Sequence, residues 1–279
     1  MTSQLPASEQ PYRHTTPMHR VVAWISQRLF DNVTYTVNHG ILKGMRRRGG
    51  LGWVPQWIAA SAETKEHEFF RSLDLKEKVV FDVGAFIGLF TMLASAKQAA
   101  RVICYEPMDR NRRRLLENLK LNHMEHVTVR PFGVGSRKAT LNMSFDPLMP
   151  GGASVNEEIA AGIDASAASV QRCTISVTTL DEDIAEQGLP APDLIKVDIE
   201  GFELDALRGA SATLAACGPA LYLEMHGETM SDKERKVAEI VRFLESAGYG
   251  NIRHVETGVR LTSENSRAGA TGHLYCTKV

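Results

Sequence analysis

The sequence predicts an α/β fold built on a mostly parallel sheet with helices on both faces. From Lys78 onward, short apolar runs alternate with segments of helical periodicity. The apolar runs are continuous rather than alternating, which is typical of strands buried on both faces. A length of 279 residues and an apolar fraction of 43% suffice for one large core. The chain is therefore expected to form one α/β domain with an N-terminal extension.

Seven segments have the length and apolar content of strands, and helical spacing recurs between them. The strands are expected at residues 79–83, 102–106, 127–131, 194–198, 220–224, 252–256 and 273–277. The helices are expected at residues 89–97, 110–122, 203–216 and 232–247. Residues 141–145 and 174–177 predict a hairpin-like excursion between the third and fourth strands.

Residues 1–60 are predicted to be a tail followed by a helical and basic extension, and residues 61–279 to be the α/β domain. Helical spacing predicts helices at residues 18–30 and 59–73. Between them, RRR at 46–48 concentrates positive charge. We interpret this cluster either as a solvated turn or as an anion-attracting lid or membrane-surface contact.

Composition narrows the function class. A formal net charge of −1 disfavours a nucleic-acid partner. Four scattered cysteines, with no CxxC pair, argue against a zinc site and a disulfide framework. The sequence has neither a signal-peptide layout nor an apolar run long enough to span a membrane, so a cytoplasmic location is expected. The oligomeric state is left open.

The most informative segment is the turn after the first strand of the domain. Asp82 ends the strand, and Gly84 and Gly88 bracket a turn into a helix. Glycines let the backbone approach a ligand closely, and the helix start offers free N–H groups. Phe86 stands where a dinucleotide fingerprint needs its middle glycine. An adenosine-bearing ligand without a pyrophosphate therefore fits better, with Asp82 facing a cationic or amine group.

The next two strands end in residues suited to a nucleoside. Glu106 follows the second strand, where a carboxylate can accept hydrogen bonds from two ribose hydroxyls. Pro107 comes directly after it. The third strand ends near Gly133 and Val134, a turn that could pack against a purine or be an ordinary glycine turn.

Four segments resemble the FkbM-type family of S-adenosylmethionine-dependent methyltransferases. They are FDVGAFIG at 81–88, YEP at 105–107, LIKVDIEGFE at 194–203 and LYLEMH at 221–226. The resemblance covers roughly residues 63–250. Members often carry Asn where this chain has Phe86, so no side-chain hydrogen bond from that position to the cofactor is expected.

The resemblance implies a class I methyltransferase fold, Rossmann-like, with S-adenosylmethionine bound across the carboxyl edge of the sheet. It assigns Asp82, Gly84 and Gly88 to the methionine part of the donor and Glu106 to its ribose. The adenine would then lie against Gly133 and Val134. The candidate cofactor-binding residues are Asp82, Gly84, Phe86, Gly88, Glu106, Pro107, Gly133, Val134 and Asp198.

The fourth strand delivers Lys196, Asp198 and Glu200 to the same edge, and Glu203 opens the next helix. Acidic residues at a helix start complement its dipole, which is the role expected of Glu203. Lys196 paired with a carboxylate can be structural. The functional interpretation places Asp198 beside the methyl donor and the acceptor hydroxyl.

The fifth strand adds Glu224 and His226 to this edge. The candidate catalytic residues are His226, Asp198, Glu200 and Lys196, with His226 as general base. A divalent metal held by Asp198, Glu200, Glu224 and His226 is a second hypothesis, which spacing alone does not decide.

These residues predict an O-methyltransferase acting on a hydroxyl or carboxyl group of a small-molecule or glycan-type acceptor. One alternative is a non-catalytic, adenosine-binding or membrane-surface module, favoured by the amphipathic segment at 18–29 and the arginine cluster. The other is a nucleotide-dependent oxidoreductase, disfavoured by Phe86 in the glycine turn.

Overall fold

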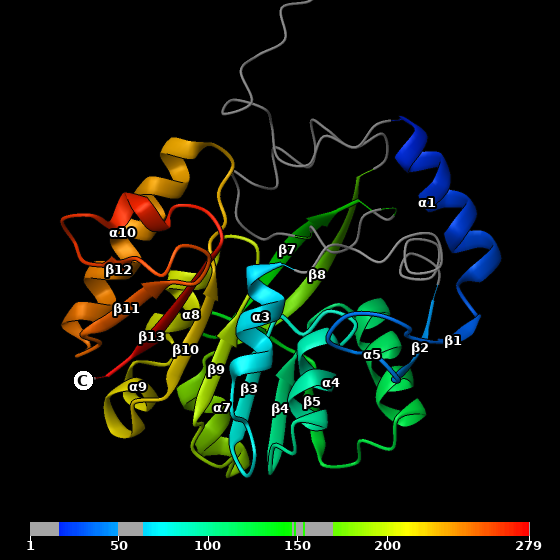
Figure 1. Cartoon of the computed structure of the whole chain (residues 1–279), viewed down its shortest axis with the longest axis horizontal. Coiled ribbons are helices and arrows are strands. Elements are labelled where there is room, and N and C mark those ends of the chain that lie inside the picture. The colour runs from blue at the N-terminus through cyan, green and yellow to red at the C-terminus, as the bar shows by residue number, and fades with distance from the viewer. Residues whose placement is uncertain (1–16, 50–63, 147, 149–152, 154–169, 279) are drawn as a thin grey trace, which may run out of the picture.

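The computed structural model describes residues 17–49, 64–146, 148, 153 and 170–278 (Figure 1). Its centre is an eight-stranded sheet in the order β12-β11-β13-β10-β9-β3-β4-β5. The strands are β3 (Val79–Val83), β4 (Arg101–Tyr105), β5 (Val127–Arg130), β9 (Leu194–Val197), β10 (Ala220–Glu224), β11 (Asn251–His254), β12 (Arg260–Leu261) and β13 (His273–Thr277).

The pairing within this sheet is mixed but mostly parallel. The five strands from β5 to β10 pair in parallel, whereas β13 runs antiparallel to both β10 and β11. All seven predicted strands are present, which confirms the predicted fold class. The predicted count of seven was one short, because β12 has only two residues and is too short to leave a periodic signal.

Helices cover both faces of the sheet (Figure 1). They include α4 (Leu89–Ala96), α5 (Asp109–Leu121), α7 (Leu180–Gln187), α8 (Glu203–Arg208), α9 (Ser211–Cys217), α10 (Met230–Ser246) and the 3-10 helix η3 (Ser266–Gly269). Along β3, Val80 packs into one apolar cluster with Phe90 of α4. Phe81 faces the other cluster, with Leu207 of α8. Because successive side chains of a strand alternate in direction, each face of the sheet has its own core.

Two helices differ from the sequence prediction. The helix expected at 203–216 is interrupted at Gly209, where an added Cβ would lie 1.9 Å from the carbonyl oxygen of Gly135. The backbone at Gly135 therefore leaves no room for a side chain at position 209. Helix α7 was not predicted, because Leu180 and Ile184 are its only large apolar residues.

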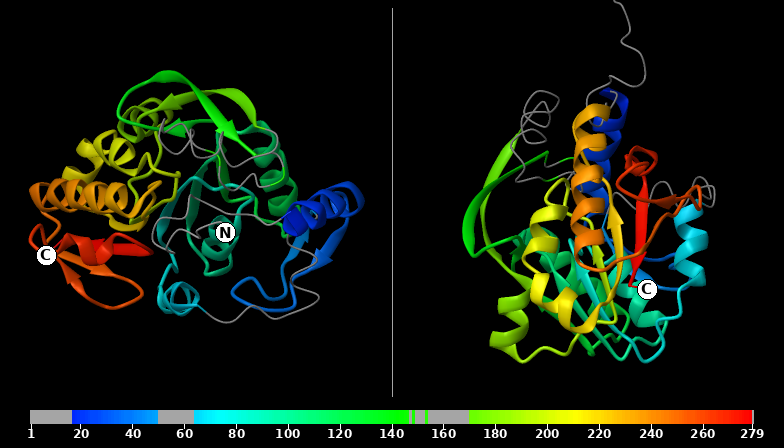
Figure 2. Two further views of the ribbon diagram at one scale, coloured as in Figure 1. Left: turned by 90° about the horizontal axis from the view of Figure 1, so that it is seen from above. Right: turned by 90° about the vertical axis from the view of Figure 1, so that its left-hand side faces the viewer.

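A smaller three-stranded sheet stands beside the carboxyl edge of the main sheet. It consists of β6 (Gly133–Val134), β7 (Ala139–Phe145) and β8 (Gln171–Thr178), in the order β6-β8-β7. The β7–β8 pair is the predicted excursion, and its antiparallel register joins Ala139 to Val177 and Phe145 to Gln171. Seen from above, this pair forms a ribbon along one side of the carboxyl edge (Figure 2). It thus supplies a side wall for whatever binds there.

The helix predicted at 18–30 of the N-terminal extension is present as α1 (Pro17–Phe30), and the tail predicted before it lies outside the described residues. In α1, the small residues Ala23 and Ser26 are buried, whereas most of the bulky apolar side chains are exposed. The exposed ones are Met18, Val21, Val22, Trp24, Ile25 and Leu29. The membrane-surface hypothesis for this segment stays a prediction. No helix in the described ranges is long and apolar enough to cross a bilayer.

The arginine cluster forms a strand rather than a turn. Residues Arg46–Arg48 are β2, which pairs with β1 (Thr34–Thr36). Asn118 and Asn122 of α5 accept hydrogen bonds from the backbone of β2, at 2.9 and 2.8 Å. The helix predicted at 59–73 is seen as α3 (Lys65–Ser72), and residues 59–63 lie outside the described ranges.

Candidate active site

The ends of β3, β4, β9 and β10 meet around a pocket at the carboxyl edge of the sheet. Gly84, Glu106, Asp198, Glu200 and Glu224 all line it. A second pocket lies next to it and shares four of its lining residues. The shared residues are Gly84, Pro107, Met143 and Ile199. The structure thus brings together most of the predicted site residues.

The glycine turn owes its composition to packing within the protein. Gly84 has φ of 84°, and an added Cβ would lie 1.9 Å from the carbonyl oxygen of Asp198. Gly88 has φ of 93°, and its Cβ would lie 2.4 Å from Cδ1 of Leu115. These close neighbours explain why both positions need glycine. Because Gly84 also lines both pockets, the expectation that this turn admits a ligand stays a prediction. Between them, Phe86 has φ of 51°, a left-handed conformation that Asn adopts more easily than Phe.

Glu106 is fixed by the main chain at the end of β4. Its Oε2 accepts a hydrogen bond from the Phe86 N–H at 2.9 Å, and its Oε1 accepts one from the Met108 N–H at 2.9 Å. The Asn111 side chain donates a third at 3.3 Å. Burial raises the pKa of Glu106 to about 7, although these hydrogen bonds act to lower it. The carboxylate is therefore held rigidly in the pocket wall and titrates near neutrality.

Asp82 lies behind the pocket rather than in it. Its side chain is fully buried, and its Oδ2 accepts a hydrogen bond from the Thr91 hydroxyl at 2.5 Å. Its Oδ1 is 3.4 Å from Nζ of Lys196. Asp82 was predicted to contact the amine of the methionine part, but its buried carboxylate does not line the pocket. The side chain of Asp82 contacts Thr91 of α4, and Lys196 is its neighbour on the adjacent strand β9, so its carboxylate pairs with a buried lysine.

Lys196 connects the glycine turn to the end of β9. Its Nζ donates to the Gly84 carbonyl oxygen at 3.1 Å and to Oδ2 of Asp198 at 2.9 Å. Burial acts to lower the pKa of Lys196, but the charges of Asp198 and Asp82 outweigh it and raise that pKa. Lys196 is thus a cation that positions Asp198, which is the structural role that the sequence left open.

Two acidic residues at the turn between β9 and α8, Glu200 and Glu203, have different surroundings. Glu200 and Gly201 both have positive φ, 53° and 97°, and Glu200 lines the pocket. Glu203 instead turns inward and is only 2% exposed. Its Oε1 accepts a hydrogen bond from the Gly201 N–H at 2.9 Å and lies 2.9 Å from Nδ1 of His226. Sequence reasoning gave Glu203 no more than a helix-start role, since an inward turn leaves no sequence signal.

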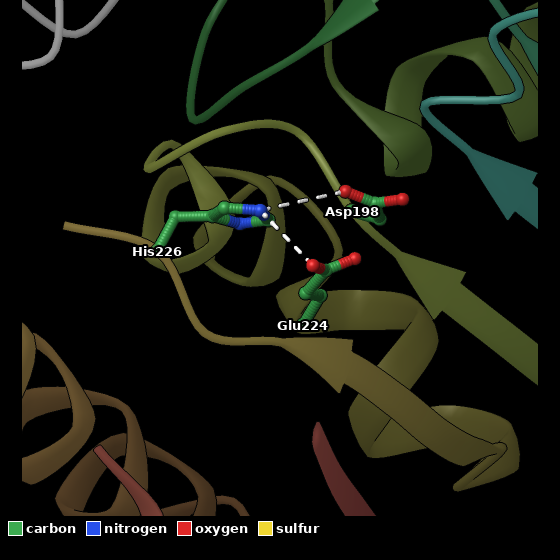
Figure 3. Close-up of side chains that lie close together, drawn as sticks. All are labelled: Asp198, Glu224 and His226. Atoms are coloured by element: carbon green, nitrogen blue, oxygen red, sulfur yellow. Dashed lines mark ion pairs between the residues drawn. The ribbon is translucent and has the colours of Figure 1, made fainter. Parts of the chain in front are cut away.

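His226 follows β10, and its buried imidazole is surrounded by the carboxylates of several acidic residues. Its Nε2 lies 3.4 Å from Oε1 of Glu224, 3.5 Å from Oε2 of Glu200 and 3.8 Å from Oδ1 of Asp198. Figure 3 shows Asp198 and Glu224 facing this nitrogen from the ends of neighbouring strands. Burial acts to lower the pKa of His226, but Glu203, Glu224 and Glu200 outweigh it and raise that pKa well above 6.5. The predicted general-base role needs a neutral imidazole, which these carboxylates disfavour.

Glu224 lies between two imidazole rings. Its second oxygen, Oε2, is 3.7 Å from Nε2 of His273, a residue on β13 that the sequence did not single out. Burial acts to raise the pKa of Glu224, but both histidines outweigh it and lower that pKa. Antiparallel pairing sets Glu224 opposite His273, a register that sequence spacing could not reveal. Glu224 is thus held as a carboxylate.

The second pocket is lined mainly by apolar residues. The predicted residues Gly133 and Val134 line it, together with Pro107. Ile175 and Val177 of β8 complete its wall. Alternation along a strand cannot tell which side of an isolated hairpin faces a pocket, so these two were not predicted.

The chain was compared with known families, curated proteins and solved structures. The family model described as the methyltransferase FkbM domain matches residues 82–250, which is more than half of the chain. The match begins at the end of β3 and ends just before β11, so it contains every pocket residue described above.

Among curated proteins, the hexuronic acid methyltransferase AglP of Haloferax volcanii is 30% identical over 139 residues. That match covers 50% of this chain and 52% of AglP. Methyltransferase 1 of Beauveria bassiana is 27% identical over 145 residues, covering 48% of this chain and 58% of that protein. The matched segment therefore spans about half the length of these relatives.

Among solved structures, the methyltransferase FkbM from Methylobacillus flagellatus superposes with a TM-score of 0.50 at 22% identity. The superposition covers 77% of this chain and 48% of that one. At this level of identity the likeness shows the fold alone.

Proposed function

The chain belongs to the FkbM methyltransferase family, and on this basis we propose that it is an S-adenosylmethionine-dependent O-methyltransferase. Its acceptor is a small molecule or glycan that presents a hydroxyl or a carboxyl group. The two adjoining pockets support this assignment, since one offers a fixed carboxylate and the other an apolar slot.

The pocket residues fit the methyl donor. When bound, S-adenosylmethionine supplies a methyl group activated by a sulfonium centre. Glu106 would accept hydrogen bonds from the ribose hydroxyls, because it lines the pocket and backbone N–H groups fix the position of its carboxylate. The slot between Pro107 and Val177 would hold the adenine. The turn at Gly84 and Phe86 would border the methionine part.

Carboxylates on the acceptor side of the pocket would take up the proton that the acceptor hydroxyl loses. Asp198 is oriented by Lys196, and Asp198, Glu200 and Glu224 present carboxylate oxygens to the same pocket as Glu106. A hydroxyl nucleophile benefits from losing its proton to such a group while its new bond forms. Holding the hydroxyl in line with the methyl group contributes much of the remaining rate.

The charge around the pocket favours a hydroxyl over a carboxylate acceptor. Asp198, Glu200 and Glu224 would repel a second carboxylate at close range. The name of AglP, a hexuronic acid methyltransferase, supports a sugar-type acceptor, since such a sugar carries both groups.

The geometry of Glu106 is the observation that carries the proposal. Glu106→Gln keeps the shape but lacks the charge that accepts two hydroxyl donors. We expect S-adenosylhomocysteine to bind this variant roughly 10- to 100-fold more weakly in calorimetric titration. The matched control is Glu125→Gln, a change at an exposed carboxylate that should leave the affinity unchanged.

If Glu106→Gln bound the ligand as tightly as the wild type, the ribose assignment would be wrong. If the wild type bound NAD but neither S-adenosylmethionine nor S-adenosylhomocysteine, the proposed donor would be wrong.

A further inference from the structure

Three donor groups converge at the acceptor end of the pocket. One ligand atom from each of Asp198, Glu224 and His226 lies within 4.8 Å of the other two. They come from the end of β9, the end of β10 and the segment after β10, and they point toward one another (Figure 3). Two carboxylates and one imidazole form a donor set that divalent metals accept.

His226 is oriented as metal-binding histidines are. Its Nδ1 is held at 2.9 Å by Glu203, itself only 2% exposed, and a ring so fixed aims its other nitrogen in one direction. That direction is toward the carboxylates. The side chain of His226 is 6% exposed, so the surrounding protein restricts the orientation of the ring.

The distances at Nε2 are too long for good hydrogen bonds but suit ligands of a common ion. Glu224 and Asp198 lie 3.4 and 3.8 Å away, beyond the usual limit of about 3.2 Å for an N–H···O hydrogen bond. Donors about 2.1 Å from a shared metal centre stand roughly 3.0–3.4 Å apart in octahedral or tetrahedral geometry. A small relaxation of Asp198 would complete such a site, and Oε2 of Glu200 is 3.5 Å from the same nitrogen.

The local charge also calls for a cation. Carboxylate oxygens of Asp198, Glu200, Glu203 and Glu224 lie 2.9–3.8 Å from the ring nitrogens of His226. Lys196 pairs with Asp198 but also with Asp82. His273 pairs with Glu224 but also with Glu256. Buried carboxylates need compensating charge, and a divalent ion supplies two positive charges at one point.

We propose that Asp198, Glu224 and His226 bind a divalent transition-metal ion such as Mn²⁺, with Glu203 positioning His226. The metal and a proton compete for Nε2, because a ligand imidazole must be neutral. For the role of the ion the inference rests on the proposed function. There it would polarise the acceptor hydroxyl and ease the loss of its proton beside the methyl donor.

The test measures metal binding directly and needs no acceptor. The full chain is titrated with MnCl₂, and free Mn²⁺ is followed by electron paramagnetic resonance. We expect one Mn²⁺ per chain, with affinity reduced at least tenfold in Asp198→Asn and Glu224→Gln. Glu203→Gln should lose roughly tenfold, as expected for a residue that orients a ligand.

The matched control is Glu256→Gln. Glu256 is another carboxylate that pairs with two histidines, His254 and His273, but it lies outside the three-donor group. Its removal should leave Mn²⁺ affinity within about threefold of the wild type. Equal losses in Glu256→Gln and Glu224→Gln would overturn the site, because they would show general charge attraction only.

Binding of S-adenosylhomocysteine is measured on every variant by calorimetry, both as a test of folding and as a separate readout. A wild-type chain that binds S-adenosylhomocysteine but not Mn²⁺ overturns the metal site and leaves the proposed donor intact. A chain that binds Mn²⁺ at this site without S-adenosylhomocysteine supports the metal site and contradicts the proposed function.

Discussion

Glu106 and Glu224 end two strands of one sheet and line the same pocket, yet their environments are opposite. Glu106 is held by N–H donors from the backbone and from Asn111, and burial raises its pKa to about 7. Glu224 faces the imidazoles of His226 and His273, which lower its pKa. Neutral donors offset only part of the cost of burying a carboxylate, whereas charged partners outweigh that cost.

The comparison separates the two tasks of the pocket. The half that we assign to the methyl donor is built by main-chain geometry and therefore depends on backbone conformation. The half that we assign to the acceptor is built by charged side chains and therefore depends on pairing across strands. The glycine turn touches both, because the Gly84 carbonyl oxygen accepts the hydrogen bond of Lys196.

Gly84→Ala should break both halves at once and have the largest effect. Its Cβ would overlap the Asp198 carbonyl oxygen in a segment with φ of 84°, so we expect a loss of about 4 kcal/mol in unfolding free energy. Urea denaturation measures it. Gly40→Ala is the matched control, since Gly40 has φ of 78° with no atom within 4 Å of its Cβ. That control should cost about 1–2 kcal/mol. Equal losses in the two variants would mean that the clash contributes nothing.

The raised pKa of Glu106 should make the free energy of unfolding depend on pH. A pKa raised from 4.5 to about 7 means that the native state binds the Glu106 proton more tightly than the unfolded state does. Its contribution to stability is therefore present at low pH and lost as pH rises from about 4.5 to 7. The loss is on the order of 3 kcal/mol, at about 1.4 kcal/mol per unit. Denaturation of wild type and Glu106→Gln across this range gives the difference. Parallel pH profiles would contradict the assignment.

The same ionisation should control ligand affinity. A charged carboxylate is the better acceptor for hydroxyl donors, so S-adenosylhomocysteine should bind roughly tenfold more tightly at pH 8 than at pH 6. In Glu106→Gln this dependence should be absent. A persistent pH dependence in that variant would place the titrating group elsewhere in the pocket.

Asn111→Ala should have the smallest effect. It removes one donor to Oε1 of Glu106, at 3.3 Å, and leaves the two backbone N–H groups in place. We expect S-adenosylhomocysteine to bind about fivefold more weakly, near 1 kcal/mol. In a Glu106→Gln background the same change should add little, because the interaction it supports is gone. Full additivity would show that Asn111 acts independently of Glu106.

The positions of most strands and helices, and the residues at the carboxyl edge, follow from the amino-acid sequence alone. Continuous apolar runs define buried strands, and the residue that follows each run must stand at the same edge of a parallel sheet. Gly84, Glu106, Asp198 and Glu224 are therefore predictable as neighbours from their positions at the ends of these runs.

What each of these residues contacts depends instead on the folded chain. Asp82 turns away from the pocket to pair with Lys196, Glu203 turns inward to hold His226, and His273 reaches Glu224 through antiparallel pairing. These contacts depend on side-chain direction and strand register. Neither leaves a trace in spacing along the chain, because the partners are brought together by packing between distant segments.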